Sequence, residues 1–233
     1  MIFRQLFERE SSTYTYLIAC PETREAALVD PVLETVERDL ALIQELGLTL
    51  AYTVETHVHA DHVTSAARLR SLAGSKVVYP ALGEIVGADV RVSEVEPLDV
   101  GRIRLQPLFT PGHTDAHHCY LIQTPGGARV LTGDALLIDG CGRTDFQGGD
   151  AATLYQSIHE KIFTLPADAL VYPAHDYHDL HVSTVGQERD HNPRLGGGKT
   201  VQEFVEIMAG LDLPYPKKID VAVPANQRCG VID

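Results

Sequence analysis

Seven side chains that can bind metal ions lie in four short blocks of the sequence. The first block is His57-Val58-His59-Ala60-Asp61-His62, and the other three contain His113, Asp134 and His175. Three histidines and an aspartate within six residues would repel one another or stay poorly solvated unless a cation or a shared hydrogen-bond network held them. Neutral imidazole nitrogen and carboxylate oxygen suit Zn²⁺ or Fe²⁺. The pattern therefore predicts a metal site.

Each block follows a segment that we expect to form a β-strand. Residues 48–55 run directly into His57, and strands expected at 103–109, 129–132 and 170–172 precede His113, Asp134 and His175. Loops at strand ends on one edge of a sheet can converge while the sheet holds them rigidly. In extended backbone, residues two apart point the same way, so His57 and His59 can face one site together.

The rest of the chain alternates between strand and helix patterns. Further strands are expected at 13–20, 26–29, 76–79, 90–92 and 119–124, with a hairpin turn at 125–127. Apolar residues at helical spacing predict helices over 34–46, 63–72 and 154–162, and Thr200 and Glu203 have the spacing of a capping box at the start of another. The sequence predicts an α/β protein with a single domain over 1–233.

The composition excludes several classes of partner. A formal net charge of -13 disfavours nucleic acid and anionic membrane surfaces, although local Arg or Lys can still hold an anionic small substrate. No apolar run approaches the about 20 residues of a membrane span. The first ten residues show no secretory signal, and the four cysteines form no CxxC pair. We expect free thiols and a cytoplasmic protein.

Three of these blocks carry a resemblance to a known family. Thr56-His57-Val58-His59-Ala60-Asp61-His62, Thr110-Pro111-Gly112-His113-Thr114 and Gly133-Asp134 are similar to the motifs of the metallo-β-lactamase superfamily. The resemblance implies an αββα sandwich with the metal site at one edge, between two sheets.

Further blocks narrow the resemblance. Residues 140–147 (GCGRTDFQ), 172–177 (YPAHDY), 192–195 (NPRL) and 222–230 (AVPANQRCG) resemble the persulfide dioxygenases, which are glutathione-dependent non-haem iron enzymes. Spacing alone suits two metal ions, and two ions suggest a hydrolase. The resemblance instead implies one Fe(II) per chain, held by His57, His113 and Asp134. His59, Asp61, His62 and His175 would then orient ligands and solvent, or remain as a vestigial second metal site.

The resemblance also implies a reaction and a substrate. Glutathione persulfide and O₂ would react at the iron, giving sulfite and regenerating glutathione. Because glutathione is anionic overall, local cations must hold it, and Arg143 can pair with a carboxylate through two hydrogen bonds. Lys217 and Lys218 are further candidates, Tyr177 could donate a hydrogen bond near the iron, and Asp145 could hold the substrate amine or position Arg143. The protein would be a monomer or a homodimer.

Two other functions compete with this interpretation. The first is a hydrolase of glutathione thioesters resembling glyoxalase II, whose TPGHTxxH pattern matches residues 110–117. It would fill two metal positions, adding His59 or Asp61, His62 and His175, and a metal-bound hydroxide would attack the thioester. The second is a non-catalytic metal-binding module, but the sequence lacks the cysteine-rich set typical of structural zinc. The remaining histidines, such as His117 and His118, are expected on the surface or supporting the site.

Overall fold

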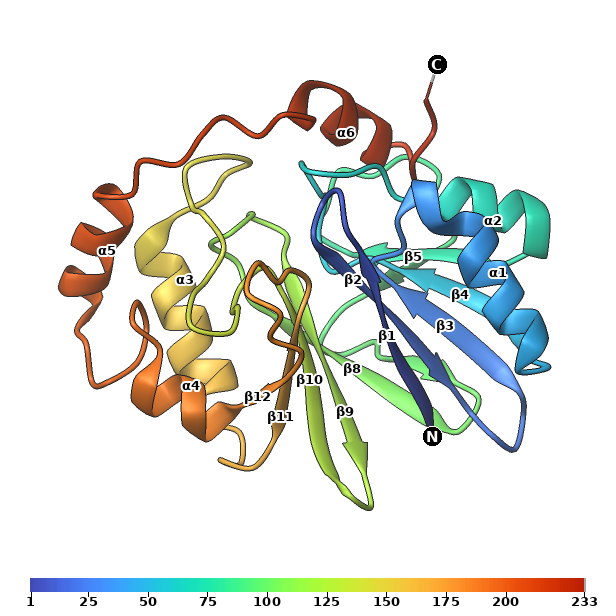
Figure 1. Cartoon of the computed structure of the whole chain (residues 1–233), viewed down its shortest axis with the longest axis horizontal. Helices are drawn as coiled ribbons and strands as arrows, with labels where there is room; N and C mark the ends of the chain where they lie inside the picture. The colour runs from blue at the N-terminus through green and yellow to red at the C-terminus, as the bar shows by residue number, and fades with distance from the viewer. Residues whose placement is uncertain (233) are drawn as a thin grey trace. The chain divides into compact units, whose positions relative to one another are not determined.

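The computed structural model describes residues 1–232 and divides into two compact units. Unit 1 comprises Met1–Leu105 and the C-terminal segment from Tyr215, and unit 2 comprises Gln106–Pro214. Each unit has its own sheet and its own helices (Figure 1). The single domain expected over 1–233 stays a prediction.

Unit 1 is built on a mixed sheet of six strands in the order β1-β2-β3-β4-β5-β6. The strands are β1 (Ile2–Glu8), β2 (Thr13–Ala19), β3 (Glu25–Val29), β4 (Thr49–Val54), β5 (Lys76–Pro80) and β6 (Val90–Val92). The first three strands are antiparallel, and β3 to β6 pair in parallel. Three helices accompany the sheet, α1 (Val36–Glu45), α2 (Ala66–Ala73) and α6 (Ile219–Asn226), with a short 3-10 turn, η1 (Leu33–Thr35), before α1 (Figure 1).

One core cluster of unit 1 lies on strands β2, β3 and β4. Every residue of β2 is buried, so this strand lacks the alternation of buried and exposed residues that marks a half-exposed strand. Leu17, Leu28 and Leu50 from the sheet pack in one cluster with Ile43 of α1 and Leu69 of α2. The cluster fixes the strands whose ends carry the first metal-binding block.

The second sheet has the order β12-β11-β10-β9-β8-β7. Its strands are β7 (Leu98–Val100), β8 (Ile103–Phe109), β9 (His118–Thr124), β10 (Gly127–Gly133), β11 (Leu170–Pro173) and β12 (Ser183–Thr184). Strand β8 runs across the boundary between the units, and β7 pairs with its first residues inside unit 1. Strands β10 and β11 are parallel, while the other pairs are antiparallel.

The helices of unit 2 are α3 (Ala151–Ser157), α4 (Val185–His191) and α5 (Val201–Ala209), with a π-helical turn, η2 (Ile158–Ile162), after α3 (Figure 1). Val130 and Val171 from the sheet pack in one core with Leu154 of α3 and Phe204 of α5. This core holds β10 and β11 side by side, and each of these strands precedes a metal-binding block.

Most elements expected from the sequence are confirmed, and the differences have physical reasons. The helix expected from residue 63 begins only at Ala66. Five elements were not predicted: β1, β7, β12, α4 and α6. Helix α6 contains Pro224, which lacks the N–H that a helix interior needs. Helix α4 has Gly186 in its first turn and a largely polar sequence, so neither propensity nor periodicity indicates it.

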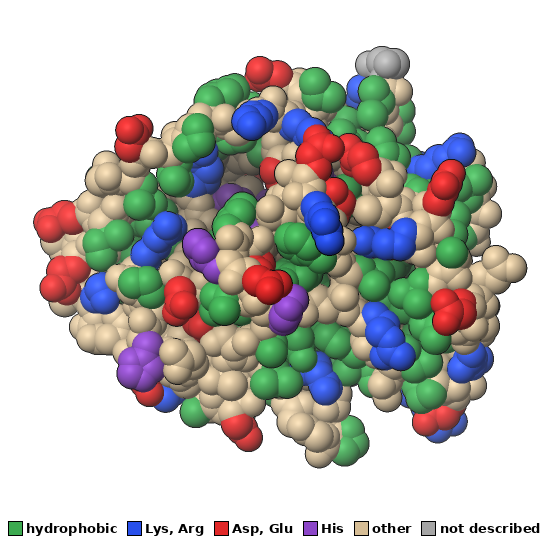
Figure 2. Space-filling model, in the orientation of Figure 1, with side chains coloured by type: hydrophobic (Ala, Val, Ile, Leu, Met, Phe, Trp, Pro, Cys, Tyr) green, Lys and Arg blue, Asp and Glu red, His purple; other side chains and the backbone are tan. Residues whose placement is uncertain are grey.

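The surface and the thiols agree with the composition. Figure 2 shows Lys and Arg side chains interspersed with Asp and Glu on the visible face, so the excess negative charge leaves local cations in place. All four cysteines are free, as expected, and all four are buried. Among the described residues, every helix is too short or too polar to cross a membrane.

Candidate metal centre

The first metal-binding block follows β4 directly and is tied to the end of β3. His57 is buried, and its Nδ1 lies 2.9 Å from the hydroxyl of Thr56. That hydroxyl donates to Asp30 Oδ2 at 3.0 Å, so the Nδ1–H of His57 donates to Thr56. Asp30 also accepts a hydrogen bond from the backbone N–H of Thr56 at 2.8 Å. Ligation by His57 would therefore use Nε2.

His59 lies between two buried carboxylates. Its Nε2 is 3.1 Å from Asp30 Oδ1 and 3.4 Å from Glu55 Oε2, and the other oxygen of Glu55 accepts from Thr64 Oγ1 at 2.5 Å. Burial works against the charged form of His59, but the carboxylates of Asp30 and Glu55 outweigh it and raise its pKa to about 10. Burial raises the pKa of Glu55. His59 Nδ1 is buried and has no hydrogen-bond partner among the described residues.

His62 and Asp61 complete the block. His62 Nδ1 donates to Asp61 Oδ2 at 3.0 Å, and Thr13 of β2 lies within 3.4 Å of both side chains. His62 Nε2 is buried without a partner within residues 1–232. The rings of His57, His59 and His62 follow one another, with centroids 4.1 Å and 4.3 Å apart. One ligand atom each from His59, Asp61 and His62 lies within 4.8 Å of the other two.

The C-terminal segment holds this block in place. Asn226, the last residue of α6, is fully buried, and its amide nitrogen donates to the carbonyls of His59 at 2.9 Å and His62 at 2.8 Å. Its amide oxygen accepts from the N–H of Thr64 at 2.8 Å. One side chain from the end of the sequence therefore fixes the backbone between two candidate ligands.

Unit 2 brings together the other three candidates. His113 Nε2 lies 3.5 Å from Asp134 Oδ2, and His175 Nδ1 donates to Asp134 Oδ1 at 2.6 Å. The other ring nitrogen of His113, Nδ1, donates to the carbonyl of Arg143 at 2.7 Å. Ligation by His113 would therefore use Nε2, next to the carboxylate oxygen that His175 does not occupy. Strands β8, β10 and β11 each lead into one of these residues.

Two neighbours, His117 and Gly142, hold Asp134 and His113 in place. His117 Nε2 accepts from the N–H of Asp134 at 3.2 Å, and its Nδ1 lies 3.0 Å from Thr110 Oγ1. This contact gives His117 the supporting role expected of the remaining histidines. Gly142 donates its N–H to the carbonyl of Asp134 at 2.7 Å. A Cβ at Gly142 would overlap that carbonyl and lie 2.7 Å from His113 Nδ1.

Four of the five substrate candidates contact other protein groups. Arg143 pairs with Asp145, with its Nε 2.6 Å from Asp145 Oδ1. Tyr177 is 65% exposed and stacks on His175 with ring planes 4° apart. Lys218 in unit 1 pairs with Glu10 at 2.9 Å and with Glu34 at 3.3 Å. Lys217 is exposed. The substrate roles of these side chains stay predictions.

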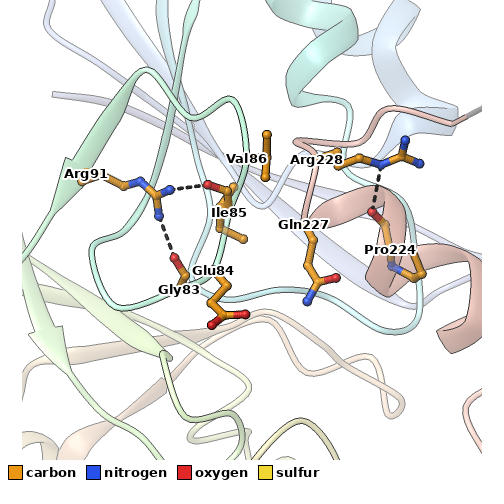
Figure 3. A pocket seen from close by; sticks show the side chains of 8 residues that line it. All are labelled: Gly83, Glu84, Ile85, Val86, Arg91, Pro224, Gln227 and Arg228. Carbon is orange, nitrogen blue, oxygen red and sulfur yellow. Dashed lines mark hydrogen bonds between the residues drawn. The ribbon is translucent and has the colours of Figure 1, made fainter.

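A cavity of about 550 Å³ in unit 1 contains none of the predicted site residues. Residues 83–86 line it together with Arg91, Pro224, Gln227 and Arg228 (Figure 3). The guanidinium of Arg91 donates to the carbonyls of Gly83 and Ile85, so it closes the loop between β5 and β6 (Figure 3).

Comparisons with known proteins identify the family. The pattern of the metallo-beta-lactamase superfamily matches residues 9–175. The chain is 53% identical to the mitochondrial persulfide dioxygenase ETHE1 of Mus musculus over 99% of this chain and 89% of that protein. It is 34% identical to a hydroxyacylglutathione hydrolase of Polaromonas sp., over 88% of this chain and 83% of that protein.

The fold comparison agrees. The crystal structure of ETHE1 from Myxococcus xanthus superposes with a TM-score of 0.95 and 52% identity, covering 99% of this chain and all of that chain. The predicted fold class, the metallo-β-lactamase α/β sandwich, is confirmed, and the chain belongs to the metallo-beta-lactamase superfamily, within its persulfide dioxygenase group.

Proposed function

We propose that this chain is a persulfide dioxygenase that converts glutathione persulfide, O₂ and water to sulfite and glutathione at one ferrous ion. The observation that carries the activity is the 53% identity to the mouse persulfide dioxygenase over nearly the whole chain. The hydrolase is a more distant relative, at 34% identity. The choice of persulfide, of metal and of ligands is supported by the donor atoms of the site and by the cations beside it.

The donor atoms suit a ferrous ion. Two imidazole nitrogens and one carboxylate oxygen are the ligand set of Fe(II) oxygenases. In unit 2, His113 Nε2 and Asp134 Oδ2 lie 3.5 Å apart, with their other polar atoms held by Arg143 and His175. In unit 1, Thr56 leaves Nε2 as the ligating atom of His57. A ferrous ion held by these residues would supply the redox chemistry for the reaction of a persulfide with O₂.

The hydrogen bond to the second carboxylate oxygen of Asp134 favours one metal ion over two. In a two-metal site, a carboxylate commonly bridges both ions. Here Oδ1 of Asp134 accepts a 2.6 Å hydrogen bond from His175, which was itself a candidate ligand for a second ion. This hydrogen bond occupies the Asp134 oxygen that would bridge to a second ion.

Among the protein's own groups, Arg143 would orient the substrate. The backbone carbonyl of Arg143 accepts the hydrogen bond from His113 Nδ1. A substrate carboxylate bound by the guanidinium of Arg143 would therefore lie close to the proposed metal ligands. The exposed Tyr177 stacks on His175, and its hydroxyl can donate to a substrate on the solvent side of that ring. Lys218 would have to leave Glu10 and Glu34 to bind the substrate.

One observation favours a second candidate, the two-metal hydrolase of glutathione thioesters. His59 Nδ1 and His62 Nε2 are buried without a partner among the described residues, and a buried unpaired polar atom costs about 1–3 kcal/mol. With Asp61 they form a group that can hold an ion within unit 1. A bound cation would satisfy both nitrogens.

Oxygen consumption separates the two candidates. With glutathione persulfide supplied, the proposal predicts O₂ uptake and sulfite formation in proportion, and no cleavage of a glutathione thioester in the absence of air. Flat O₂ consumption would count against the dioxygenase. Thioester cleavage without air would establish the hydrolase.

A further inference from the structure

The guanidinium of Arg143 is held on three sides. Its Nε and Nη2 donate to the two oxygens of Asp145, at 2.6 Å and 2.7 Å, and its Nη1 donates to the carbonyl of Pro214 at 2.8 Å. The ring of Phe146 lies 4.5 Å from the guanidinium carbon. The edge of Arg143 that binds carboxylates with paired hydrogen bonds is therefore filled by a carboxylate of the protein itself.

This pair lies beside the proposed metal ligands. The carbonyl of Arg143 accepts from His113 Nδ1, and the preceding residue, Gly142, packs against Asp134. The hydrogen bonds from Arg143 hold the pKa of Asp145 below its usual range, and His113 adds a smaller effect in the same direction. Asp145 is thus an ionised carboxylate at neutral pH, placed where the proposed function puts a carboxylate of the substrate.

We infer that Asp145 is an internal competitor for the substrate, occupying Arg143 until a carboxylate of glutathione persulfide displaces it. The inference rests on the proposed function, because it needs a substrate that carries carboxylates. Paired hydrogen bonds to Nε and Nη2 admit one carboxylate at a time, so Asp145 and the substrate exclude each other there. Asp145 then determines how tightly Arg143 binds the carboxylate of glutathione persulfide.

The exposure of the two side chains makes the exchange feasible. The side chain of Arg143 is 18% exposed, while that of Asp145 is 60% exposed. Arg143 can stay in place on Phe146 and Pro214 while Asp145 swings into solvent. Ion pairs with one exposed partner are weak, and losing the competitor is expected to tighten ligand binding about two- to fivefold.

The test measures binding of glutathione to the iron-loaded protein without air, by titration calorimetry. Asp145→Asn is expected to lower the Kd for glutathione about two- to fivefold. Glutathione diethyl ester, which has no carboxylate, should show no gain. An unchanged or higher Kd for glutathione in Asp145→Asn would overturn the inference, and so would an equal gain for the ester.

The chain offers a matched control pair. Arg104 and Asp99 form the same two-point contact, at 2.8 Å and 3.0 Å, on the antiparallel pair β7–β8. Asp99→Asn removes one negative charge in the same way and should leave the glutathione Kd unchanged. A general effect of net charge would instead appear in both variants.

A double-mutant cycle assigns the gain to Arg143. Arg143→Gln is expected to weaken glutathione binding about tenfold, since it removes a charge-assisted two-point contact. In that background Asp145→Asn should bring no further gain, and a gain that persisted would contradict the inference. If the inference fails while persulfide-dependent O₂ uptake remains, only the role of Asp145 is wrong. If O₂ uptake is absent, the proposed function itself fails.

Discussion

Each histidine of the candidate metal centre has one ring nitrogen held by the protein, and this decides which nitrogen can bind an ion. His57 and His113 donate from Nδ1 to Thr56 and to the carbonyl of Arg143. His59 uses Nε2 to contact Asp30 and Glu55. Such partners fix the tautomer and the ring orientation before the metal arrives, and they commonly alter metal affinity about 10- to 100-fold.

The ligand assignment is tested most simply at His113. His113→Ala removes one of two nitrogen ligands, so we expect iron content per chain to fall at least about tenfold. His191→Ala, which removes an exposed histidine at the end of α4, should leave the iron content unchanged. Metal analysis of the purified proteins measures both. Full iron occupancy in His113→Ala would show that the assignment is wrong.

Sequence reasoning found the ligand types but not their partners. The block from His57 to His62 stands out because so many histidines lie within six residues. Asp30 contacts the same block from the end of β3, and Asn226 contacts it from α6. No local pattern marks Asp30, and the family resemblance covers Asn226 without giving it a role. Only a match to the hydrolase pattern TPGHTxxH drew attention to His117, which supports Asp134. These contacts join residues distant in sequence, so they depend on the fold.

At the scale of elements, the loops that follow the strands must pack closely together to hold the candidate ligands in position. The segment after β10 returns so closely that Gly142 donates to the carbonyl of Asp134. A side chain there would overlap that carbonyl and press on His113. The loop can hold both candidate ligands only because this position has no Cβ.

Gly142→Ala is therefore expected to displace the ligands, and we predict about 10-fold weaker iron binding, comparable to the loss of a residue that supports a ligand. Gly126→Ala is the matched control, because its Cβ would meet only Thr124 Oγ1, at 3.9 Å, in an exposed turn. Iron titration of the metal-free proteins compares the two. Equal affinity in both variants would mean that the loop adapts without moving the ligands.

Helix α5 shows how a local signal defines an element. The predicted capping box is present, since Thr200 Oγ1 accepts from the N–H of Glu203 at 3.3 Å and Glu203 accepts from the N–H of Thr200 at 2.7 Å. Thr200→Ala should lower the free energy of unfolding by about 1 kcal/mol. Gln202→Ala, with only an exposed contact to Glu206, should change it less in urea unfolding.

The same cap gives a pH dependence. Hydrogen bonds from Thr200 lower the pKa of Glu203 from its ordinary value of 4.5. A lowered pKa stabilises the fold above the ordinary value, and this contribution is lost as pH falls through the lower folded-state pKa. The stability difference between wild type and Thr200→Ala should therefore shrink below pH 4.5. A difference that grew on acidification would contradict the cap.

Elements with strong periodicity or strong caps were predicted, and the others were not. Strand β2 is buried throughout, β8 largely alternates apolar and polar residues, and α5 has both a cap and an apolar face. Strand β1 lies at the edge of its sheet with a mixed sequence, and α6 contains Pro224. Tertiary contacts, such as those of Asn226, stabilise α6 despite its proline.

At the scale of the whole molecule, the candidate ligands are divided between two compact units. Unit 1 contributes the block from His57 to His62, and unit 2 contributes His113, Asp134 and His175. The family resemblance, and not periodicity or spacing, selected one iron over two metal ions.

The number and kind of metal ions per chain test this account most directly. The protein would be produced with iron and zinc both supplied, and its metal content measured by mass spectrometry. We predict one iron per chain, in a protein that consumes O₂ with glutathione persulfide. Two ions per chain, zinc or mixed, with glutathione thioester cleavage in the absence of air, would contradict it.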